Sequence, residues 1–177
     1  MGFLETDRIS LRALEPEDLD ILYKWENDSS LWQNGATITP YSRFALHDYL
    51  KNSLHDIFQS RQLRLMVEEK NSGKPIGTID LYDYDPVNQR AGIGILLDED
   101  FRNRGYGAET LYLIEDYAFR FLQLNQLYAH IPVSNIPSMK LFEKCGYIHS
   151  GNLTSWIKTS GGFEDVHLMQ LINTPHH

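Results

Sequence analysis

The sequence predicts an α/β (α+β) protein with a mixed, mostly antiparallel central sheet and helices packed on its faces. Apolar stretches with two-residue alternation follow one another with only short turns between them, as antiparallel strands do. Other stretches carry apolar residues at helical spacing and separate strand-like segments from each other. At 177 residues the chain is expected to form one domain, residues 1–177, with its core at about 7–172.

The first strand is expected at residues 8–12 and a helix directly after it. Residues 15–18 favour a helix start, because Pro16 fits a first turn and the acidic residues beside it suit a helix N-terminus. Ser42 is a candidate N-cap of a second helix. The segment between them, Asp28 to Tyr41, combines turn residues with aromatic residues, and we expect it to form a loop over a substrate.

The middle and end of the chain alternate strands with helices. A hairpin with a turn at residues 71–74 is expected, followed by another strand, a helix that continues to Phe121, a further strand and a short helix closed by Gly146. The expected strands after the first are residues 63–68, 75–82, 90–97, 127–133, 147–151 and 165–171.

Between the strand at 90–97 and the next helix, the residue pattern indicates an anion site. Gly105 and Gly107 allow a tight turn, and the helix that follows begins with unpaired N–H groups that carry partial positive charge. Arg102 and Arg104 add full charges. The spacing fits neither the P-loop nor the dinucleotide fingerprint, so the pattern indicates a phosphate-binding turn. A plain helix-start turn with solvated arginines is the alternative.

Composition limits the partners. The formal net charge of −8 argues against nucleic-acid binding and suits a cationic substrate, although such a charge also serves solubility alone. The single cysteine, Cys145, cannot form an internal disulfide, and no apolar stretch is long enough for a membrane span or a signal peptide. We therefore expect a cytoplasmic protein that binds neither nucleic acid nor a membrane.

The ordered motifs resemble one family. The arginine-glycine turn is followed at a suitable distance by Ser134-Asn135-Ile136-Pro137-Ser138 and by residues 141–147, and together they resemble the GNAT superfamily of acyl-CoA-dependent N-acetyltransferases. Residues 9–18 and 162–167 look like the branch that holds ribosomal-protein N-terminal acetyltransferases and spermidine acetyltransferases. The resemblance covers most of the chain.

The resemblance implies a reaction and a donor site. It implies transfer of an acetyl group from acetyl-CoA to a primary amine, either a small amine or polyamine or a protein N-terminus, by direct attack in a ternary complex without a metal; a homodimer is compatible with the family. In Asn135, contact with the cofactor and capping of the short helix can coexist. The coenzyme A contacts it implies are Ile95, Leu96, Leu97, Arg102, Asn103, Arg104, Gly105, Tyr106, Gly107, Ala108, Asn135 and Ser138.

The catalytic positions depart from the family pattern. Gly92, Phe142 and Ile157 stand where related enzymes carry acids or bases, and none of these side chains can transfer a proton. Ser138 remains as a donor to the departing thiolate. The reacting amine must be neutral, so a base is needed.

For the base, the sequence offers Asp80, Tyr82 and Asp83, of which Asp80 and Tyr82 share a strand face. The alternative is that Asp80 and Asp83 are ordinary polar residues of a strand end and a turn and that bulk water is the base. Because Gly92, Phe142 and Ile157 lack such groups, a catalytically impaired acyl-CoA-binding sensor or interaction module is the rival interpretation. The acidic residues at 80–85 lack the glycine and glutamate of a calcium loop. His130 is favoured as an ordinary strand residue, and the alternative is that it points into the cleft.

Overall fold

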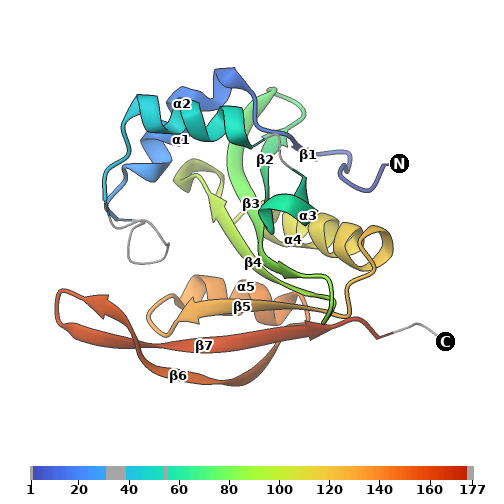
Figure 1. The fold of residues 1–177 in the computed structure, drawn as a ribbon, viewed down its shortest axis with the longest axis vertical. Helices are drawn as coiled ribbons and strands as arrows, with labels where there is room; N and C mark the ends of the chain where they lie inside the picture. Colours follow the sequence, from blue (N-terminus) through green and yellow to red (C-terminus); the bar gives the residue numbers. More distant parts are fainter. Residues whose placement is uncertain (1, 31–38, 54–55, 175–177) are drawn as a thin grey trace.

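The fold is built on one seven-stranded sheet. The computed structural model describes residues 2–30, 39–53 and 56–174. Figure 1 shows the strands, which lie in the order β1-β2-β3-β4-β5-β7-β6. Their bounds are β1 Ile9–Arg12, β2 Leu63–Glu69, β3 Lys74–Asp85, β4 Arg90–Leu97, β5 Gln126–Pro132, β6 Ile148–Thr159 and β7 Gly162–Ile172.

Neighbouring strands are antiparallel with one exception. β4 and β5 run parallel, and they are joined by a connection that contains a helix, as parallel neighbours require. All other adjacent pairs are antiparallel. The mixed, mostly antiparallel sheet expected from the sequence is therefore confirmed, and its single parallel pair lies near the middle.

Helices cover both faces of the sheet. α1 and α2 lie side by side over one face, and α4 packs over the other, against β1, β3 and β4 (Figure 1). Ser42 caps α2, since its side chain accepts a hydrogen bond of 3.0 Å from the Ala45 N–H. The helical segments are η1 Pro16–Asp18, α1 Leu19–Glu26, α2 Arg43–Asn52, α3 Ile57–Ser60, η3 Glu99–Phe101, α4 Tyr106–Asp116, η4 Tyr117–Phe121 and α5 Ile136–Lys144.

The core divides into two clusters because side chains alternate across the sheet. Leu65 and Val67 of β2 belong to the larger cluster, which includes the apolar side of α4. Met66, between them in sequence, packs with Leu22 and Trp25 of α1 in the smaller cluster. The same alternation sends successive residues of β4 to opposite faces of the sheet.

The last two strands differ from the expectation. β6 and β7 form a long hairpin, whereas residues 147–151 and 165–171 were the expected strands. Two register shifts, between His149 and Gly151 and between Leu153 and Ile157, interrupt the alternation of β6. Because a bulge breaks the two-residue period, the pattern hides the length of the strand.

Candidate active site

The central feature of the site is a split in the sheet. β4 and β5 pair only through Arg90–Gln126, Ala91–Leu127 and Gly92–Tyr128 among the described residues. Beyond Gly92, β4 continues to pair with β3 as far as Leu97, and β5 continues to pair with β7 as far as Pro132. The facing edges of the two strands therefore carry backbone N–H and C=O groups that no neighbouring strand satisfies.

A cavity of about 100 Å³ occupies this split. Its walls come from both diverging strands and from the start of α5, so three elements distant in sequence meet there. A groove with open strand edges suits an extended ligand with amide groups, because such a ligand can replace the missing strand. The lining residues are Ile93, Gly94, Ile95, Ala129, His130, Ile131, Pro132, Asn135, Ser138 and Phe142.

The arginine-glycine turn leads directly into α4. Gly105 is the N-cap residue with φ of 85°, a left-handed conformation that favours glycine, and Asn103 also has a positive φ of 60°. The helix begins at Tyr106. The N–H groups of Tyr106, Gly107 and Ala108 lie in the first turn, where helix geometry leaves them free for an anion.

The Arg102 side chain and the Arg104 backbone connect the turn to neighbouring elements. Arg102 Nε donates to the Leu97 carbonyl at 3.0 Å, which ties the turn to the end of β4. The Arg104 carbonyl accepts from Arg8 Nη2 at 2.9 Å, and the Arg8 guanidinium lies 4.3 Å from the centre of the Tyr106 ring. Arg8 also pairs with Glu109 of α4. Sequence reasoning missed Arg8, because only the fold brings residue 8 to the turn.

The Tyr106 side chain packs within the protein and Gly107 has no side chain, so both leave only their backbone at the turn. The Tyr106 side chain is buried, and its hydroxyl donates to Glu69 Oε1 at 2.9 Å, so the ring faces the protein. A Cβ on Gly107 would lie 3.1 Å from a methyl carbon of Leu141 in α5. The glycine therefore allows α4 and α5 to approach each other beside the split.

Asn135 and Ser138 lie together at the start of α5. The Asn135 side chain accepts a hydrogen bond of 3.3 Å from the Ser138 N–H and caps the helix, and both residues line the cavity. Capping and cavity lining thus coexist. Phe142, one turn further on, is buried at the cavity wall, where its ring packs edge-on against Tyr147. No proton donor stands at position 142.

Tyr82 fills the space beside Gly92. A Cβ on Gly92 would lie 2.3 Å from Tyr82 Cε2, so the tyrosine ring occupies the volume that a side chain at 92 would need. Tyr82 and Gly92 are direct cross-strand partners at the last pair before β4 and β5 diverge. The Tyr82 ring also makes an edge-on contact with Tyr128 of β5. The Tyr82 hydroxyl therefore lies close to position 92, where the family pattern often has a glutamate.

Burial changes the acid–base character of the residues at the split. Burial raises the pKa of Tyr82, and its hydroxyl lies near the backbone N–H of His130. The hydroxyl is therefore neutral near pH 7 and keeps a hydrogen that it can donate. Burial also lowers the pKa of His130 below its usual 6.5, with Asp83 opposing the shift. The His130 imidazole is accordingly neutral and able to accept a proton.

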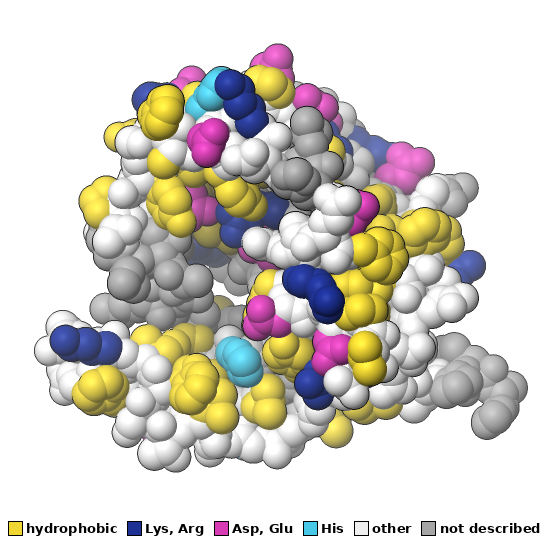
Figure 2. Space-filling model, in the orientation of Figure 1, with side chains coloured by type: hydrophobic (Ala, Val, Ile, Leu, Met, Phe, Trp, Pro, Cys, Tyr) yellow, Lys and Arg dark blue, Asp and Glu magenta, His cyan; other side chains and the backbone are white. Residues whose placement is uncertain are grey.

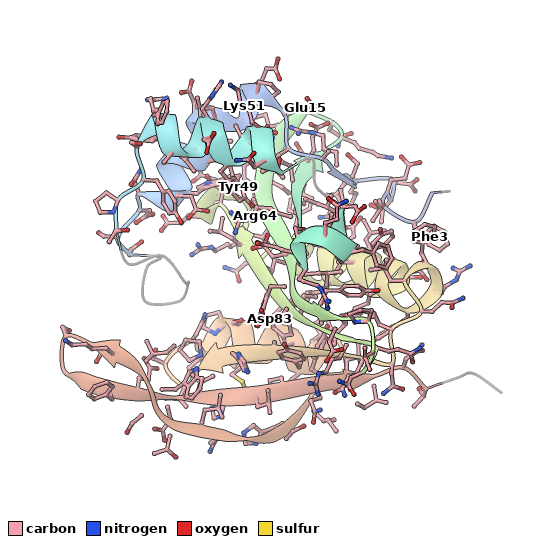
Figure 3. The ribbon with its side chains drawn as sticks, viewed as in Figure 1. Phe3, Glu15, Tyr49, Lys51, Arg64 and Asp83 are labelled. Atoms are coloured by element: carbon pink, nitrogen blue, oxygen red, sulfur yellow. The ribbon has the colours of Figure 1, made fainter. Side chains whose placement is uncertain are left out.

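Asp80 is engaged by a neighbour. Arg64 Nε and Nη2 donate to its two carboxylate oxygens at 2.6 and 2.8 Å, and Arg64 Nη1 donates to Glu26 of α1 at 2.9 Å. Because both oxygens hold the guanidinium, Asp80 suits a binding role better than the base role expected from the sequence. Figure 3 shows Arg64 and Tyr49 between α2 and the central strands, and the Arg64 guanidinium lies 5.6 Å from the Tyr49 ring centre.

The space around this ion pair is open to one side. Figure 2 shows a hollow between the α1–α2 region and the β6–β7 hairpin, with basic atoms at its back. In the Asp28 to Tyr41 segment expected over the substrate, residues 31–38 lie outside the described residues. Ile157 lies on β6 opposite Glu164.

Other chemistries find little support. Burial raises the pKa of the Cys145 thiol to about 11, so the thiol is protonated and a poor nucleophile. Within the described ranges, three or more His, Cys, Asp or Glu side chains nowhere gather as metal ligands. None of the helices in that part of the chain combines the length and apolar character that crossing a bilayer needs.

Comparisons with known proteins identify the family. The sequence profile of the Acetyltransferase (GNAT) domain matches residues 8–148. An uncharacterised N-acetyltransferase of Bacillus licheniformis is 28% identical over 173 residues, which cover 97% of each chain. A spermidine N(1)-acetyltransferase of Vibrio cholerae is 25% identical over 170 residues, covering 96% of this chain and 95% of the relative.

The fold comparison agrees. The crystal structure of the Vibrio cholerae spermidine N-acetyltransferase in complex with CoA and spermine superposes with a TM-score of 0.85. It covers 94% of this chain and 96% of that chain at 24% identity, a level that supports the fold alone. The family profile supplies the activity. The chain belongs to the GNAT acetyltransferase family and is an enzyme that moves an acetyl group from acetyl-CoA to an amine.

Proposed function

We propose that the acceptor is a small cationic primary amine that enters from the α1–α2 face, while acetyl-CoA lies in the split between β4 and β5. The observation that carries this proposal is the split itself, whose open edges adjoin the free N–H groups of the α4 start. The pantetheine arm replaces the missing strand, and the pyrophosphate lies on the first turn of α4. The two faces of β4 then divide donor from acceptor.

In this arrangement the donor contacts fall into two groups. Ile95, Leu96 and Leu97 contribute the backbone of the open β4 edge, and residues 102–108 contribute N–H groups and charge to the pyrophosphate. Asn135 and Ser138 contact the pantetheine near the sulfur, supported by their place in the cavity wall. The Ser138 hydroxyl donates a hydrogen bond to the departing thiolate. Backbone N–H groups at the open edge stabilise the oxyanion.

His130 accepts the amine proton in this proposal, in place of Asp80. His130 lines the cavity, and partial desolvation there lowers the pKa of its imidazole, whereas both oxygens of Asp80 hold Arg64. The Tyr82 ring lies against Gly92 of β4 and Tyr128 of β5 at the base of the split. Its neutral hydroxyl orients the substrate. The carboxylates of Asp80 and Glu26, with Arg64 between them, line the acceptor side.

The amine class rests on charge and on relatives. The net charge of −8 attracts cations over a range of about 30 Å at 0.01 M salt and about 10 Å at 0.1 M salt. Relatives from Vibrio cholerae and Escherichia coli carry the name spermidine N(1)-acetyltransferase. Phe142 does not exclude a polyamine, since Ser138 and water can supply the thiolate with a proton.

A substrate panel tests the proposal. Coenzyme A release is followed with spermidine, spermine, monoamines, amino acids and peptides with free N-termini. We expect turnover with small cationic amines to exceed turnover with peptides. Faster turnover with peptides overturns the small-amine assignment and favours a protein N-terminus. Acetyl-CoA binding without turnover on any amine indicates the catalytically impaired sensor instead.

The base assignment has its own test in the pH dependence of His130→Gln. His130 accepts a proton only above its pKa, which is held below 6.5, so the wild-type rate declines toward acid pH. We expect His130→Gln to lose about a hundredfold in kcat/KM at pH 7, with unchanged acetyl-CoA affinity. The deficit shrinks toward about pH 10, where the amine loses its proton unaided.

Ser138→Ala and His47→Gln accompany the His130→Gln variant, the first as a test of the acid and the second as a control. If Ser138 protonates the thiolate, Ser138→Ala lowers kcat more than it weakens acetyl-CoA binding. His47 lies on α2 and serves as a matched histidine control that leaves the pH profile unchanged. An unchanged profile for His130→Gln as well assigns the base to water.

We further propose a cytoplasmic homo-oligomer. Trp156 and Phe163 of the β6–β7 hairpin expose 59% and 68% of their surface, which supports a contact with a second copy. A dodecameric structure is described for the Vibrio cholerae spermidine N-acetyltransferase, which is 26% identical over 94% of this chain. Light scattering of wild type and of Trp156→Lys tests this, and a wild-type monomer contradicts it.

A further inference from the structure

We propose that His149, Asn152 and His167 form a binding site for a first-row divalent metal ion such as Zn²⁺ on the β6–β7 hairpin, separate from the acetyl-transfer site. Three donor atoms converge there: His149 Nε2 lies 2.8 Å from Asn152 Oδ1, His167 Nδ1 lies 2.8 Å from the same oxygen, and the two ring nitrogens are 3.2 Å apart. The other histidines among the described residues, His47 and His130, lie on other elements.

The spacing matches a metal's coordination sphere. Zinc binds imidazole nitrogen at about 2.0–2.1 Å, and two ligands at a tetrahedral angle are then about 3.3 Å apart. The nitrogen–nitrogen distance of 3.2 Å fits that value. The Asn152 oxygen lies 2.8 Å from each nitrogen, which is shorter than the tetrahedral spacing and close to the roughly 2.9 Å expected of ligands at a right angle, so the three atoms form one face of a distorted coordination polyhedron. Water completes the remaining positions.

Hydrogen bonds alone cannot satisfy His149 Nε2, His167 Nδ1 and Asn152 Oδ1 at the same time. Because Asn152 Oδ1 is an acceptor, both ring nitrogens must carry hydrogens to bond it, and the two N–H groups then face each other. If only one ring carries its hydrogen there, the other nitrogen presents a lone pair to the oxygen. If the Asn152 amide is turned end for end, its NH₂ group donates to both ring nitrogens, and the lone pairs of the two nitrogens then face each other. A cation at the centre satisfies all three atoms at once.

The bulge in β6 builds the cluster. In a regular strand, residues 149 and 152 project to opposite faces. Here His149 is opposite Met169, Gly151 opposite Leu168 and Asn152 opposite His167, so Ser150 is the extra residue of the bulge. The extra residue returns His149 and Asn152 to one face, beside His167 of the neighbouring strand. The ligands thus come from two strands, and a bound ion crosslinks the edge strand to β7.

The ligand set selects the metal and its affinity. Imidazole nitrogens suit Zn²⁺, Ni²⁺ and Cu²⁺, whereas Mg²⁺ requires oxygen ligands. His149 and Asn152 are exposed, so the ion enters and leaves readily. No carboxylate bonds the outer ring nitrogens of either histidine in the part of the chain that the structure describes, and such a bond normally strengthens a site. We expect a dissociation constant on the order of micromolar.

Calorimetric titration with Zn²⁺ tests the site, in a chain carrying His176→Ala and His177→Ala so that the terminal histidines do not compete. We expect one equivalent to bind and to raise the melting temperature. His149→Gln and His167→Gln are expected to abolish binding and the rise, and Asn152→Ala to weaken binding about tenfold. His47→Gln is the matched control and retains both.

Three outcomes overturn the site. These are no saturable Zn²⁺ binding, binding that His149→Gln and His167→Gln leave intact, or an equal response to Mg²⁺. Circular dichroism of each variant establishes that it is folded. Acetyl transfer by the His149→Gln variant is expected to match the parent chain, because His149 lies on the edge strand and outside the cavity wall. A metal-free active enzyme with a zinc-free hairpin contradicts only this inference and leaves the proposed function standing.

Discussion

At the residue scale, the sequence predicts one property of Gly92 correctly but not the contact that leaves no room for a side chain there. The sequence indicates that a familiar acidic slot is empty. It cannot show that the Tyr82 ring fills the vacated volume, because that contact depends on the cross-strand register of β3 and β4. His130 is a similar case. Alternation predicts a strand residue, but only the divergence of β4 and β5 turns it toward a cavity.

The contact between Gly92 and Tyr82 predicts a strong cost for Gly92→Ala. The added Cβ meets three ring atoms at 2.3 to 2.8 Å, so we expect a loss of about 1–3 kcal/mol in urea denaturation. Gly94→Ala is the matched control on the same strand, since its Cβ has only a 3.9 Å contact. The double change with Tyr82→Ala should recover part of the loss; simple additivity contradicts this explanation.

Glu115 on α4 gives a second prediction, because burial raises its pKa to about 7, against a smaller lowering by the nearby Tyr147 hydroxyl. Its Oε1 is buried without a hydrogen-bond partner among the described residues. The folded protein therefore holds the proton more tightly than the unfolded chain, whose value is near 4.5. This contribution to stability is complete below pH 4.5 and is lost as pH rises through 7.

Glu115→Gln should therefore be more stable than wild type at pH 8, by about 1–3 kcal/mol, because the glutamine keeps the neutral form. Near pH 4.5 the two proteins should unfold at similar urea concentrations. Chemical denaturation at both pH values provides the comparison. A constant difference across this range contradicts a buried, titrating carboxyl.

At the scale of elements, the turn before α4 could be predicted because its signal is local. Glycine spacing, flanking arginines and a following helix lie within a few residues, and the structure places Gly105 in a left-handed conformation, while Gly107 lies within α4. The β6–β7 hairpin could not be predicted at its full length. Its bulges displace the alternation, and no local residue signals them.

Gly105→Ala tests the turn as an element. The positive φ makes alanine unfavourable by about 1 kcal/mol, while the nearest atom to the new Cβ is 3.7 Å away, so strain and not collision is responsible. Gly73, with φ of 66° and open space around it, is the matched control. We expect both variants to lose similar stability and only Gly105→Ala to bind acetyl-CoA more weakly. Equal affinities of the two variants contradict the role of the turn.

At the scale of the molecule, one sheet connects strands from residue 9 to residue 172, which supports the proposal of a single domain. The order of strands could be inferred only through the family resemblance, since periodicity does not state which strands are neighbours. The split likewise depends on two strands that diverge after three pairs. Long-range register, which no local pattern contains, decides where the site lies.

The split predicts how the whole protein responds to its donor. With acetyl-CoA in place, backbone amides on residues 93–97 and 129–131 should exchange hydrogen more slowly, because the ligand covers both open edges. The pairs that precede the split should change little. Saturating acetyl-CoA should also add about 2.7 kcal/mol of stability at one hundred times its dissociation constant. Protection confined to α4 contradicts placement in the split.

The divergence of β4 and β5 has a cost outside catalysis. Two interior strands with unsatisfied edges resemble the border of an unfinished sheet, and such borders recruit other extended chains and initiate aggregation. Without acetyl-CoA, these unpaired edges lie in the middle of the sheet between β4 and β5. We therefore expect the enzyme without acetyl-CoA to aggregate faster than its acetyl-CoA complex at the same concentration.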